Sequence, residues 1–255
     1  MGMDDRGQPR GQLAGAVALV TGGSRGIGAA IARHLGQAGA DVAITYNTSA
    51  EQAAKVVAEV SALGVRSVAV RAPATERGAV DAAVLEAAAD LGGLDILVNN
   101  AGIARYGPVA ETSDEDIDDI IDVNIRAVFT GTRAALGVLR DGGRVITIGS
   151  NLADRVTSPG LALYSMSKSA LVGFTKGLAH DLGPRRITAN LVQPGSTDTD
   201  MNPASSPDAA EQLATSVLGH YGTADDIAAT VVHLAGPGGA HITGTVLTID
   251  GGQNT

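Results

Sequence analysis

Seven short apolar segments recur along this chain of 255 residues, and alanine-rich stretches with helical spacing separate them. The segments occupy residues 16–21, 41–46, 67–70, 94–99, 144–149, 187–192 and 245–249. Near-continuous runs of Val, Ile and Leu are typical of strands that are covered on both faces. Regular alternation of such strands with helices implies a parallel sheet with right-handed crossovers. The pattern predicts an α/β fold with seven parallel strands and helices on both faces of the sheet.

The chain has no Pro-, Gly- or Ser-rich linker that would divide it, which favours one domain over residues 13–255. Residues 1–12 are charged and polar, and we expect them to form a disordered leader. The alternation breaks at 196–222, where STDTDMNPASSPD precedes a short helix-like piece. A long irregular segment in a compact domain is usually functional, and we expect this one to be a substrate lid.

Charge and composition exclude several classes of protein. The 18 Lys and Arg residues against 27 Asp and Glu give a formal charge of −9, which argues against binding a nucleic-acid polymer. The absence of Cys excludes disulfides and thiolate chemistry and fits a reducing compartment. We expect no membrane span, since no apolar run approaches about 18 residues, and no metal site, since the His residues lack ligand spacing. These features predict a soluble cytoplasmic protein.

A glycine-rich turn directly follows the first predicted strand. The sequence TGGSRGIG spans residues 21–28 and leads into a helix. Glycines permit close approach of the backbone to a diphosphate, and a helix N-terminus offers unpaired N–H groups. The expected cofactor contacts are Gly22, Ser24, Arg25, Gly26, Ile27 and Gly28. The stretch also satisfies GxSxG with Ser24 as a hydrolase nucleophile, but its place after the first strand and the lack of a marked His partner argue against that alternative.

The second strand ends in Asn47, Thr48 and Ser49, without the acidic residue that usually bonds the ribose of NAD. Asp41 stands at the opposite end of the strand. Hydroxyls and amides of residues 47–49, with Arg25, could instead hold a 2′-phosphate. We therefore favour NADP over NAD. In the alternative interpretation these are turn residues, with Ser49 capping a helix over 50–63.

Tyr164 and Lys168 are four residues apart, and this spacing places them on one face of a helix. Bringing a phenol from a pKa of about 10 to near 7 requires about 4 kcal/mol. An ammonium about 4 Å away supplies roughly that at an effective dielectric of about 20, and an oxidised nicotinamide would add further positive charge. Tyr164 could thus act as a general acid or base, although such pairs also occur by chance on helix surfaces.

Ser150 directly follows strand 144–149, where ligands are commonly bound. Asn124 lies inside an amphipathic helix, where an amide more often forms a structural hydrogen bond.

Taken together, TGGSRGIG, NNAG, the Asn of DVNIRAVF, IGS, YSMSK and QPGSTDTDM resemble the short-chain dehydrogenase/reductase family in both content and order. The resemblance covers residues 13–252 and is strongest to 3-oxoacyl-[acyl-carrier-protein] reductase-like members. It implies a single-domain, Rossmann-like, doubly wound sheet and NAD(P)-dependent interconversion of a ketone or 3-oxoacyl group with a secondary alcohol. It also implies a homotetramer with contacts through helices around 113–138 and 162–182 and the last strand.

The resemblance implies a role for each matching residue. Tyr164 would donate a proton to the carbonyl oxygen, and Ser150 would hydrogen-bond the same oxygen. Lys168 would lower the phenol pKa and hold the nicotinamide ribose, and Asn124 would position a water beside Lys168. Further cofactor contacts would be Asn100, Ala101, Gly102, Pro194, Gly195, Thr197 and Thr199, besides Tyr164 and Lys168 themselves.

Two positions depart from the family pattern. Pro73 stands where an Asp commonly contacts adenine, so packing or backbone would have to replace that contact. Ser150 and Tyr164 are 14 residues apart rather than the common 13, which alters the loop beside the substrate. NLADR and QPGSTDTDMNP also resemble nucleotide-binding proteins of a signalling or biofilm-dispersal type with the same fold. That alternative would not require the complete Asn, Ser, Tyr and Lys set, which favours catalysis.

Overall fold

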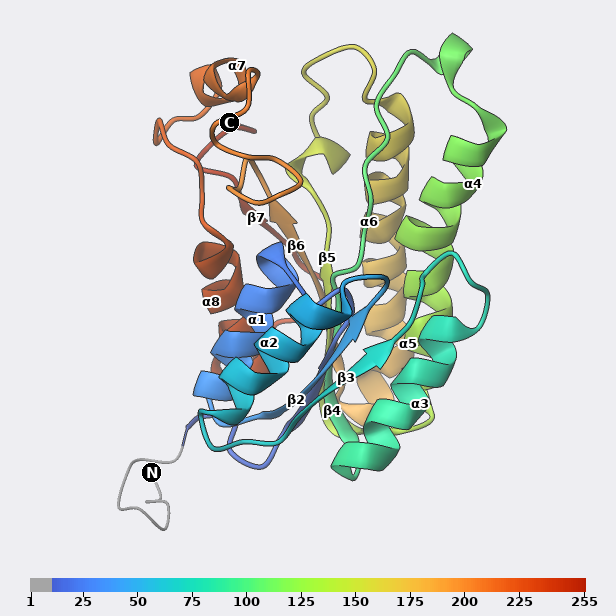
Figure 1. Ribbon diagram of the computed structural model, residues 1–255, viewed down its shortest axis with the longest axis vertical. Coiled ribbons are helices and arrows are strands. Elements are labelled where there is room, and N and C mark those ends of the chain that lie inside the picture. Colours follow the sequence, from blue (N-terminus) through green and yellow to red (C-terminus); the bar gives the residue numbers. More distant parts are fainter. Residues whose placement is uncertain (1–10) are drawn as a thin grey trace.

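A seven-stranded parallel sheet forms the centre of the molecule, which we describe for residues 11–255 from a computed structural model (Figure 1). The strands are β1 (Val17–Val20), β2 (Asp41–Tyr46), β3 (Ser67–Arg71), β4 (Leu94–Asn99), β5 (Leu139–Ile148), β6 (Thr188–Pro194) and β7 (Val246–Ile249). Their order is β3-β2-β1-β4-β5-β6-β7, and every neighbouring pair is parallel. The predicted fold class is confirmed. Residues 1–10 of the predicted leader lie outside the described residues.

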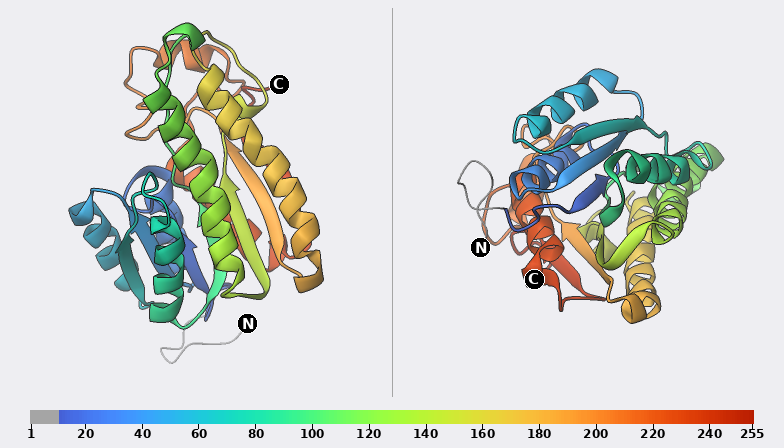
Figure 2. Two further views of the ribbon diagram at one scale, coloured as in Figure 1. Left: turned by 90° about the vertical axis from the view of Figure 1, so that its right-hand side faces the viewer. Right: turned by 90° about the horizontal axis from the view of Figure 1, so that it is seen from below.

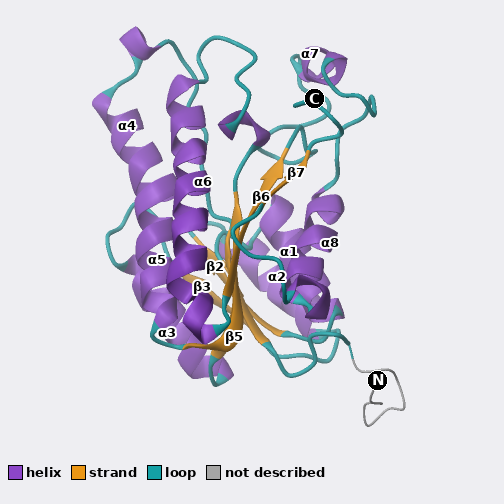
Figure 3. Ribbon diagram, turned by 180° about the vertical axis from the view of Figure 1, so that it is seen from behind, coloured by secondary structure: helices purple, strands orange, loops and turns teal. Residues whose placement is uncertain are grey.

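Helices cover both faces of the sheet, as the view from behind makes plain (Figure 3). One layer consists of α1 (Gly26–Gln37), α2 (Ala50–Ser61) and α8 (Ala224–Ala235), and the other of α3 (Ala79–Leu91), α5 (Ala127–Leu136) and α6 (Ala162–Leu182). Because successive side chains of a strand point to opposite faces, Val20 and Ile44 pack into the first core, and Leu19 and Leu97 into the second. The short helix α7 (Ala209–Ala214) lies within the predicted lid.

The helix predicted around 113–138 is continuous but irregular (Figure 2). It begins as α4 (Asp114–Ile121), where the Ser113 hydroxyl accepts a hydrogen bond from the Asp116 N–H at 3.1 Å. A π-helical turn, Asp122–Arg126, then joins α4 to α5. Such turns widen a helix locally and often occur at functional sites. The turn contains Asn124, one of the predicted site residues.

Two local predictions differ from the structure. Strand β5 begins at residue 139 rather than 144, because a register shift against β4 absorbs the LRDGG segment that resembles a turn. The Arg140 guanidinium bonds the Asp95 carboxylate at 2.7 Å and fixes this irregular start. Ser49 occupies the N-cap of α2, but its side chain makes no capping bond, so that prediction was wrong. Its ψ of 63° departs from the extended backbone that directs a capping hydroxyl toward the first turn.

Candidate functional site

The predicted site residues gather at the carboxyl ends of the strands, around the junction of β1 and β4. Here the strand order reverses: β2 and β3 follow on one side of β1, and β5, β6 and β7 lie beyond β4. Ligands of open α/β sheets bind outside the strand ends at such a point. The glycine turn leaves β1, residues 99–102 leave β4, Ser150 follows β5, and residues 194–199 leave β6. Four chain segments thus converge on one edge of the sheet.

The glycine turn has a shape that larger residues would prevent. Gly26 has a φ of +52°, a left-handed conformation that favours glycine. A Cβ at Gly28 would overlap the Gly22 carbonyl oxygen and lie 2.5 Å from Asn100 Nδ2. The N-cap of α1, Arg25, makes no side-chain capping bond, so the first-turn N–H groups receive no acceptor from it. This geometry fits the diphosphate of a dinucleotide cofactor.

Residues after β4 are fastened to that turn. The Asn100 side-chain amide donates to the carbonyl oxygens of Thr21 at 2.9 Å and Gly22 at 3.2 Å. The backbone N–H groups of Asn100 and Ala101 both donate to Thr21 Oγ1. A Cβ at Gly102 would lie 3.4 Å from both Asn124 Oδ1 and Lys168 Nζ. The segment therefore connects the glycine turn to the predicted catalytic residues.

The end of β2 lies beside the glycine turn, because the Gly22 N–H donates to Thr45 Oγ1 at 3.0 Å. Asn47 and Thr48 are exposed and Ser49 is half-buried. Among the described residues, 11–255, these three side chains make no hydrogen bonds. Arg25 is exposed and approaches the Asp200 carboxylate at 3.8 Å, so its neighbour is the start of the 196–222 segment. Pro73 follows β3, and its side chain offers adenine no polar contact.

The four predicted catalytic side chains are all buried. Asn124, Ser150, Tyr164 and Lys168 have exposed fractions of 1%, 7%, 8% and 5%. Tyr164 and Lys168 lie in the first two turns of α6, and Lys168 Nζ donates to the Ile148 carbonyl at 3.2 Å. The same Nζ is 5.8 Å from the centroid of the Tyr164 ring. The face of α6 that carries both residues therefore packs against the end of β5, next to Ser150.

Burial sets the protonation of Tyr164 and Lys168. Burial raises the pKa of the Tyr164 phenol, the nearby Tyr106 raises it further, and the polar Ser150 side chain lowers it. Burial also lowers the pKa of Lys168 to about 8. The expectation was that Lys168, together with the positive charge of an oxidised nicotinamide, makes the phenol acidic, and the protein groups by themselves raise its pKa instead. The reason is that desolvation disfavours the charged form of both groups, while the amine is directed to a backbone carbonyl.

Asn124 is fully engaged in structural hydrogen bonds. Its Oδ1 accepts from the Ile103 N–H at 2.9 Å, and its Nδ2 donates to the Ile103 carbonyl at 2.9 Å and to Ser167 Oγ at 3.0 Å. The side chain thereby fixes residues after β4 against α6. Its predicted role in placing a water beside Lys168 stays a prediction.

The segment after β6 reaches across to the glycine turn. The Gly195 N–H donates to the Ile249 carbonyl at 2.9 Å, and Thr197 Oγ1 donates to the Gly195 carbonyl at 3.0 Å. A Cβ at Gly26 would meet the Thr199 methyl group at 3.6 Å. Thr199 therefore lies beside the glycine turn, and its predicted contact with the cofactor stays a prediction.

Sequence reasoning missed two buried amides near this site. Asn151 and Gln253 are 8% and 6% exposed, and their side chains bond each other at 3.3 Å. Both lie in segments that resemble ordinary polar loops, and 102 residues separate them. No local pattern indicates such a pair, so only the folded arrangement identifies it.

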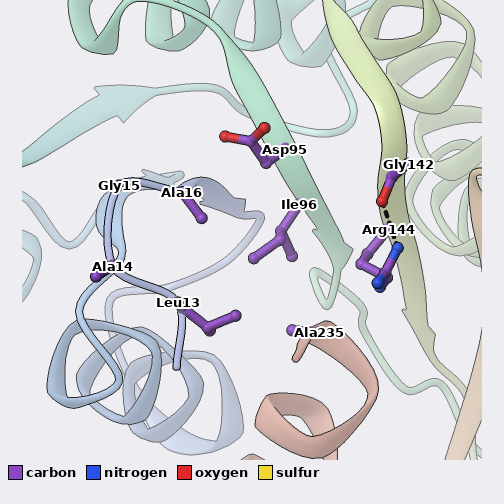
Figure 4. Close-up of a pocket in the computed structure, with 9 residues that line it drawn as sticks. All are labelled: Leu13, Ala14, Gly15, Ala16, Asp95, Ile96, Gly142, Arg144 and Ala235. Atoms are coloured by element: carbon purple, nitrogen blue, oxygen red, sulfur yellow. Dashed lines mark hydrogen bonds between the residues drawn. The ribbon is translucent and has the colours of Figure 1, made fainter. Parts of the chain in front are cut away.

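A separate hollow of about 290 Å³ lies at the amino ends of β1, β4 and β5 (Figure 4). Its wall includes Leu13, Asp95 and Arg144, and the Arg144 side chain donates to the Gly142 carbonyl. None of the predicted site residues lines it. No helix within residues 11–255 combines the length and the apolar character needed to cross a membrane.

Comparison with known proteins agrees with the geometry. The family described as Enoyl-(Acyl carrier protein) reductase matches residues 22–254. A short-chain dehydrogenase from Burkholderia cenocepacia J2315, solved in complex with NADP, is 55% identical. It superposes with a TM-score of 0.95 over 96% of this chain and 100% of that chain.

Two curated relatives have contrasting descriptions. The cyclic-di-GMP-binding biofilm dispersal mediator protein of Escherichia coli strain K12 is 41% identical over 94% of this chain and 98% of its own length. A 3-oxoacyl-[acyl-carrier-protein] reductase of Staphylococcus aureus is 40% identical over 92% of this chain and 97% of its own length.

Proposed function

Because the chain belongs to the short-chain dehydrogenase/reductase family of NAD(P)-dependent oxidoreductases, we propose that it is an NADPH-dependent reductase of ketone or 3-oxoacyl substrates. The observation that carries the proposal is the convergence of Ser150, Tyr164 and Lys168, all buried, beside a glycine turn shaped for a diphosphate. A hydroxyl, a phenol and an amine at one strand edge are the groups that polarise and protonate a carbonyl.

The proposed cofactor is NADPH, which supplies a hydride when bound. Gly26 and Gly28, with the first N–H groups of α1, would hold its diphosphate, and Thr199 would cover it. Asn47 and Thr48, exposed at the end of β2, would receive the 2′-phosphate without carboxylate repulsion. The NADP complex of the Burkholderia relative supports this choice.

Tyr164 is the proposed general acid. Its raised pKa keeps the phenol protonated at neutral pH, as reduction of a carbonyl requires. Ser150 would donate a second hydrogen bond to the same carbonyl oxygen as negative charge develops there. Lys168, with its pKa lowered to about 8, is close enough to neutrality to release and regain a proton. Asn124 would act in a water relay through its backbone carbonyl, because its amide is already bonded.

Tyr106 and Met201 would form an apolar wall beside the substrate. The Tyr106 ring contacts the Tyr164 ring edge-on, with centroids 5.8 Å apart, and Tyr106 is 64% exposed. Met201, in the proposed lid over 196–222, is also exposed. Backbone bonds between Ser196, Asp198 and Gly222 hold the two ends of that segment together, which supports movement of the segment as one unit.

We also propose that the protein forms a homotetramer through α5 and α6. Phe129 on α5 is 54% exposed and packs beside Phe174 of α6, with ring centroids 5.6 Å apart. Aromatic residues are enriched at protein–protein interfaces, and two adjoining rings on neighbouring helices fit such a contact. Sedimentation of the purified protein would measure the oligomeric state, and a monomer would contradict the tetramer.

We also place the protein in the cytoplasm, a location that the lack of cysteine supports.

The test of function is turnover. Purified protein is incubated with NADPH and a panel of ketones and 3-oxoacyl thioesters, and loss of NADPH absorbance is followed. We expect turnover that falls by about 10²-fold or more in Tyr164→Phe, while the variant still binds NADPH. Equal turnover in both proteins would refute the assignment of Tyr164.

A second candidate function is nucleotide binding without catalysis, favoured by the 41% identity to the Escherichia coli mediator protein. It predicts no carbonyl turnover and measurable affinity for cyclic-di-GMP in calorimetry. The buried Ser150, Tyr164 and Lys168 set supports the reductase over this alternative, because a binding protein has no need of an acid–base pair.

A further inference from the structure

Gln253 is a buried amide that lies between three segments bordering the candidate site. It belongs to the turn over 250–255 that follows β7, and it is 6% exposed. Its side chain packs directly on the turn after β6, since a Cβ at Gly195 would overlap Gln253 Oε1. Burial of a primary amide is costly unless its donors and acceptor are bonded. The partners of this amide are therefore informative.

The Gln253 side-chain amide accepts two hydrogen bonds and donates two. Its Oε1 accepts from the Ser196 N–H at 2.8 Å and from Asn151 Nδ2 at 3.3 Å. Its Nε2 donates to Ser196 Oγ at 2.9 Å and to the Gln212 carbonyl at 3.1 Å. An amide offers two donors and one oxygen with two lone pairs, so the set is complete. Both ends of the amide are fixed, which also fixes its orientation.

The Nε2 end leads into the proposed lid. Ser196 Oγ donates to Gln212 Oε1 at 2.7 Å, so Gln253, Ser196 and Gln212 form one chain of hydrogen bonds. The Gln212 side chain, on α7, exchanges two further bonds with Asn202, at 2.8 and 3.1 Å. Helix α7 and the loop before it are thus connected to Gln253 through a continuous polar network.

The Oε1 end of the Gln253 amide is bonded to Asn151, the residue next to the proposed catalytic Ser150. Asn151 directly follows Ser150, and its backbone carbonyl accepts from Asn254 Nδ2 at 2.8 Å. Asn254 has no side-chain bond to the lid or to Ser196 among the described residues, because its other contacts are with Asn151 and Asp250. Among the described residues of this turn, Gln253 is therefore the one whose side chain bonds both the loop after Ser150 and the lid over 196–222.

We propose that Gln253 is a positioning residue that couples the lid over 196–222 to the Ser150 loop, so that ordering the lid over bound substrate also aligns the serine hydroxyl. The proposal rests on the proposed reductase function. Gln253 touches none of the reacting groups, and it acts through Asn151 on one side and through Ser196 and Gln212 on the other. Its effect should therefore divide between substrate binding and turnover according to which end of the amide is removed.

Three variants separate the two ends. Gln253→Glu keeps the oxygen that accepts from Ser196 and Asn151, but it loses the donor and directs an acceptor at the Gln212 carbonyl. Gln253→Met keeps the length of the side chain and removes both ends. Asn254→Ala is the matched control, since it weakens the Asn151 tie without touching the lid. Thermal unfolding confirms that each variant is folded, and Gln253→Glu carries the test should Gln253→Met fail to fold.

The readouts are backbone hydrogen exchange of peptides covering 196–222, NADPH affinity by fluorescence, and steady-state KM and kcat for a ketone that the wild-type protein reduces. In Gln253→Glu we expect about tenfold faster exchange at α7 and about a tenfold higher ketone KM, with kcat within twofold of wild type. Tenfold corresponds to about 1.4 kcal/mol, the scale of one or two net hydrogen bonds. Gln253→Met should add a loss of about tenfold in kcat, and Asn254→Ala should leave lid exchange unchanged.

The proposal is overturned if α7 exchanges at the wild-type rate in both Gln253 variants. It is equally overturned if Asn254→Ala loosens the lid as much as Gln253→Met, because the turn would then act only as a general support. Hydrogen exchange requires no turnover. Absence of ketone reduction in every protein, wild type included, would thus count against the reductase assignment, while hydrogen exchange would still show whether Gln253 holds the lid.

Discussion

The burial of Lys168 leads to a prediction about stability that is independent of any substrate. Lys168 is 5% exposed, donates to the Ile148 carbonyl at 3.2 Å, and has a pKa lowered by burial to about 8. An ammonium in such a place raises the free energy of the folded state relative to the unfolded chain, where the same amine is hydrated. Replacement by Met, of similar length and without charge, should remove that penalty.

The magnitude follows from the difference in pKa. A fall from about 10.5 to about 8 corresponds to about 3 kcal/mol at 1.36 kcal/mol per unit. Met leaves the Ile148 carbonyl without this donor, which costs about 1 kcal/mol. We therefore expect Lys168→Met to be more stable than wild type by about 2 kcal/mol at neutral pH, even though the substitution removes a residue proposed to act in catalysis.

The stability difference between Lys168→Met and wild type should change with pH in a defined direction. Below about pH 8 the amine is protonated in both the folded and the unfolded state, so the whole penalty is present. Between about 8 and 10.5 the unfolded state binds more protons, and wild-type stability rises with pH through this group. Above that window the penalty is gone. The advantage of Lys168→Met should shrink across the window and reverse to a deficit of about 1 kcal/mol.

Urea unfolding of both proteins without cofactor, at one protein concentration and at about pH 7, 9 and 10.5, measures this difference. Comparing the variant with wild type at each pH cancels the titration of the groups whose pKa the substitution leaves unchanged. A stability difference that does not change with pH, or a variant that is less stable at neutral pH, would refute the claim that burial of the charged Lys168 destabilises the folded protein.

Three further outcomes are expected. Asn47→Asp places a carboxylate at the end of β2, so the ratio of NADPH to NADH affinity should fall by about tenfold or more in titrations of both cofactors; an unchanged ratio would contradict our placement of the 2′-phosphate. Gly28→Ala forces a Cβ against the Gly22 carbonyl, and it should abolish NADPH binding and cost about 2 kcal/mol or more in unfolding experiments; wild-type affinity would count against the turn as the diphosphate site. The kcat for reduction should decline as pH rises through about 8, because Lys168 then loses its charge while Tyr164, with its raised pKa, stays protonated; a flat profile would exclude Lys168 as the titrating group.

The sheet and most of its strands are predictable from the sequence, because a strand is recognised from the spacing and the length of a short run of apolar residues, and both are local properties. β2 and β4 have the predicted bounds, since residues 41–46 and 94–99 each contain three consecutive apolar residues, 42–44 and 96–98, with polar residues on both sides. The start of β5 was missed because its first residues, LRDGG, have the composition of a turn. They join the sheet only through a register shift and the ion pair between Arg140 and Asp95.

The position of most candidate site residues at the strand ends was also predictable, because most of the motifs follow a strand or open a helix; Asn124, inside a helix, is the exception. Their roles stay predictions. Their electrostatics were not predictable. The sequence indicated a phenol made acidic by Lys168, whereas the pKa of the phenol depends on how much water the fold removes around Tyr164 and on Tyr106 beside it. The π-turn at Asn124 likewise leaves the apolar periodicity of the helix almost unchanged, so no pattern predicts it. Contacts between distant segments, such as Asn151 with Gln253, depend on the completed fold.

The bonds between Asn100 and the glycine turn have a consequence for the order of folding. Thr21 and Asn100 are 79 residues apart, and the turn takes its shape from that partner as much as from its own glycines. Contacts of such high sequence separation form late, since a long loop must close first. A nascent chain that has emerged only as far as β3 therefore lacks the partner that shapes the turn. Nucleotide affinity should arise abruptly once the fourth strand has docked, rather than grow with chain length.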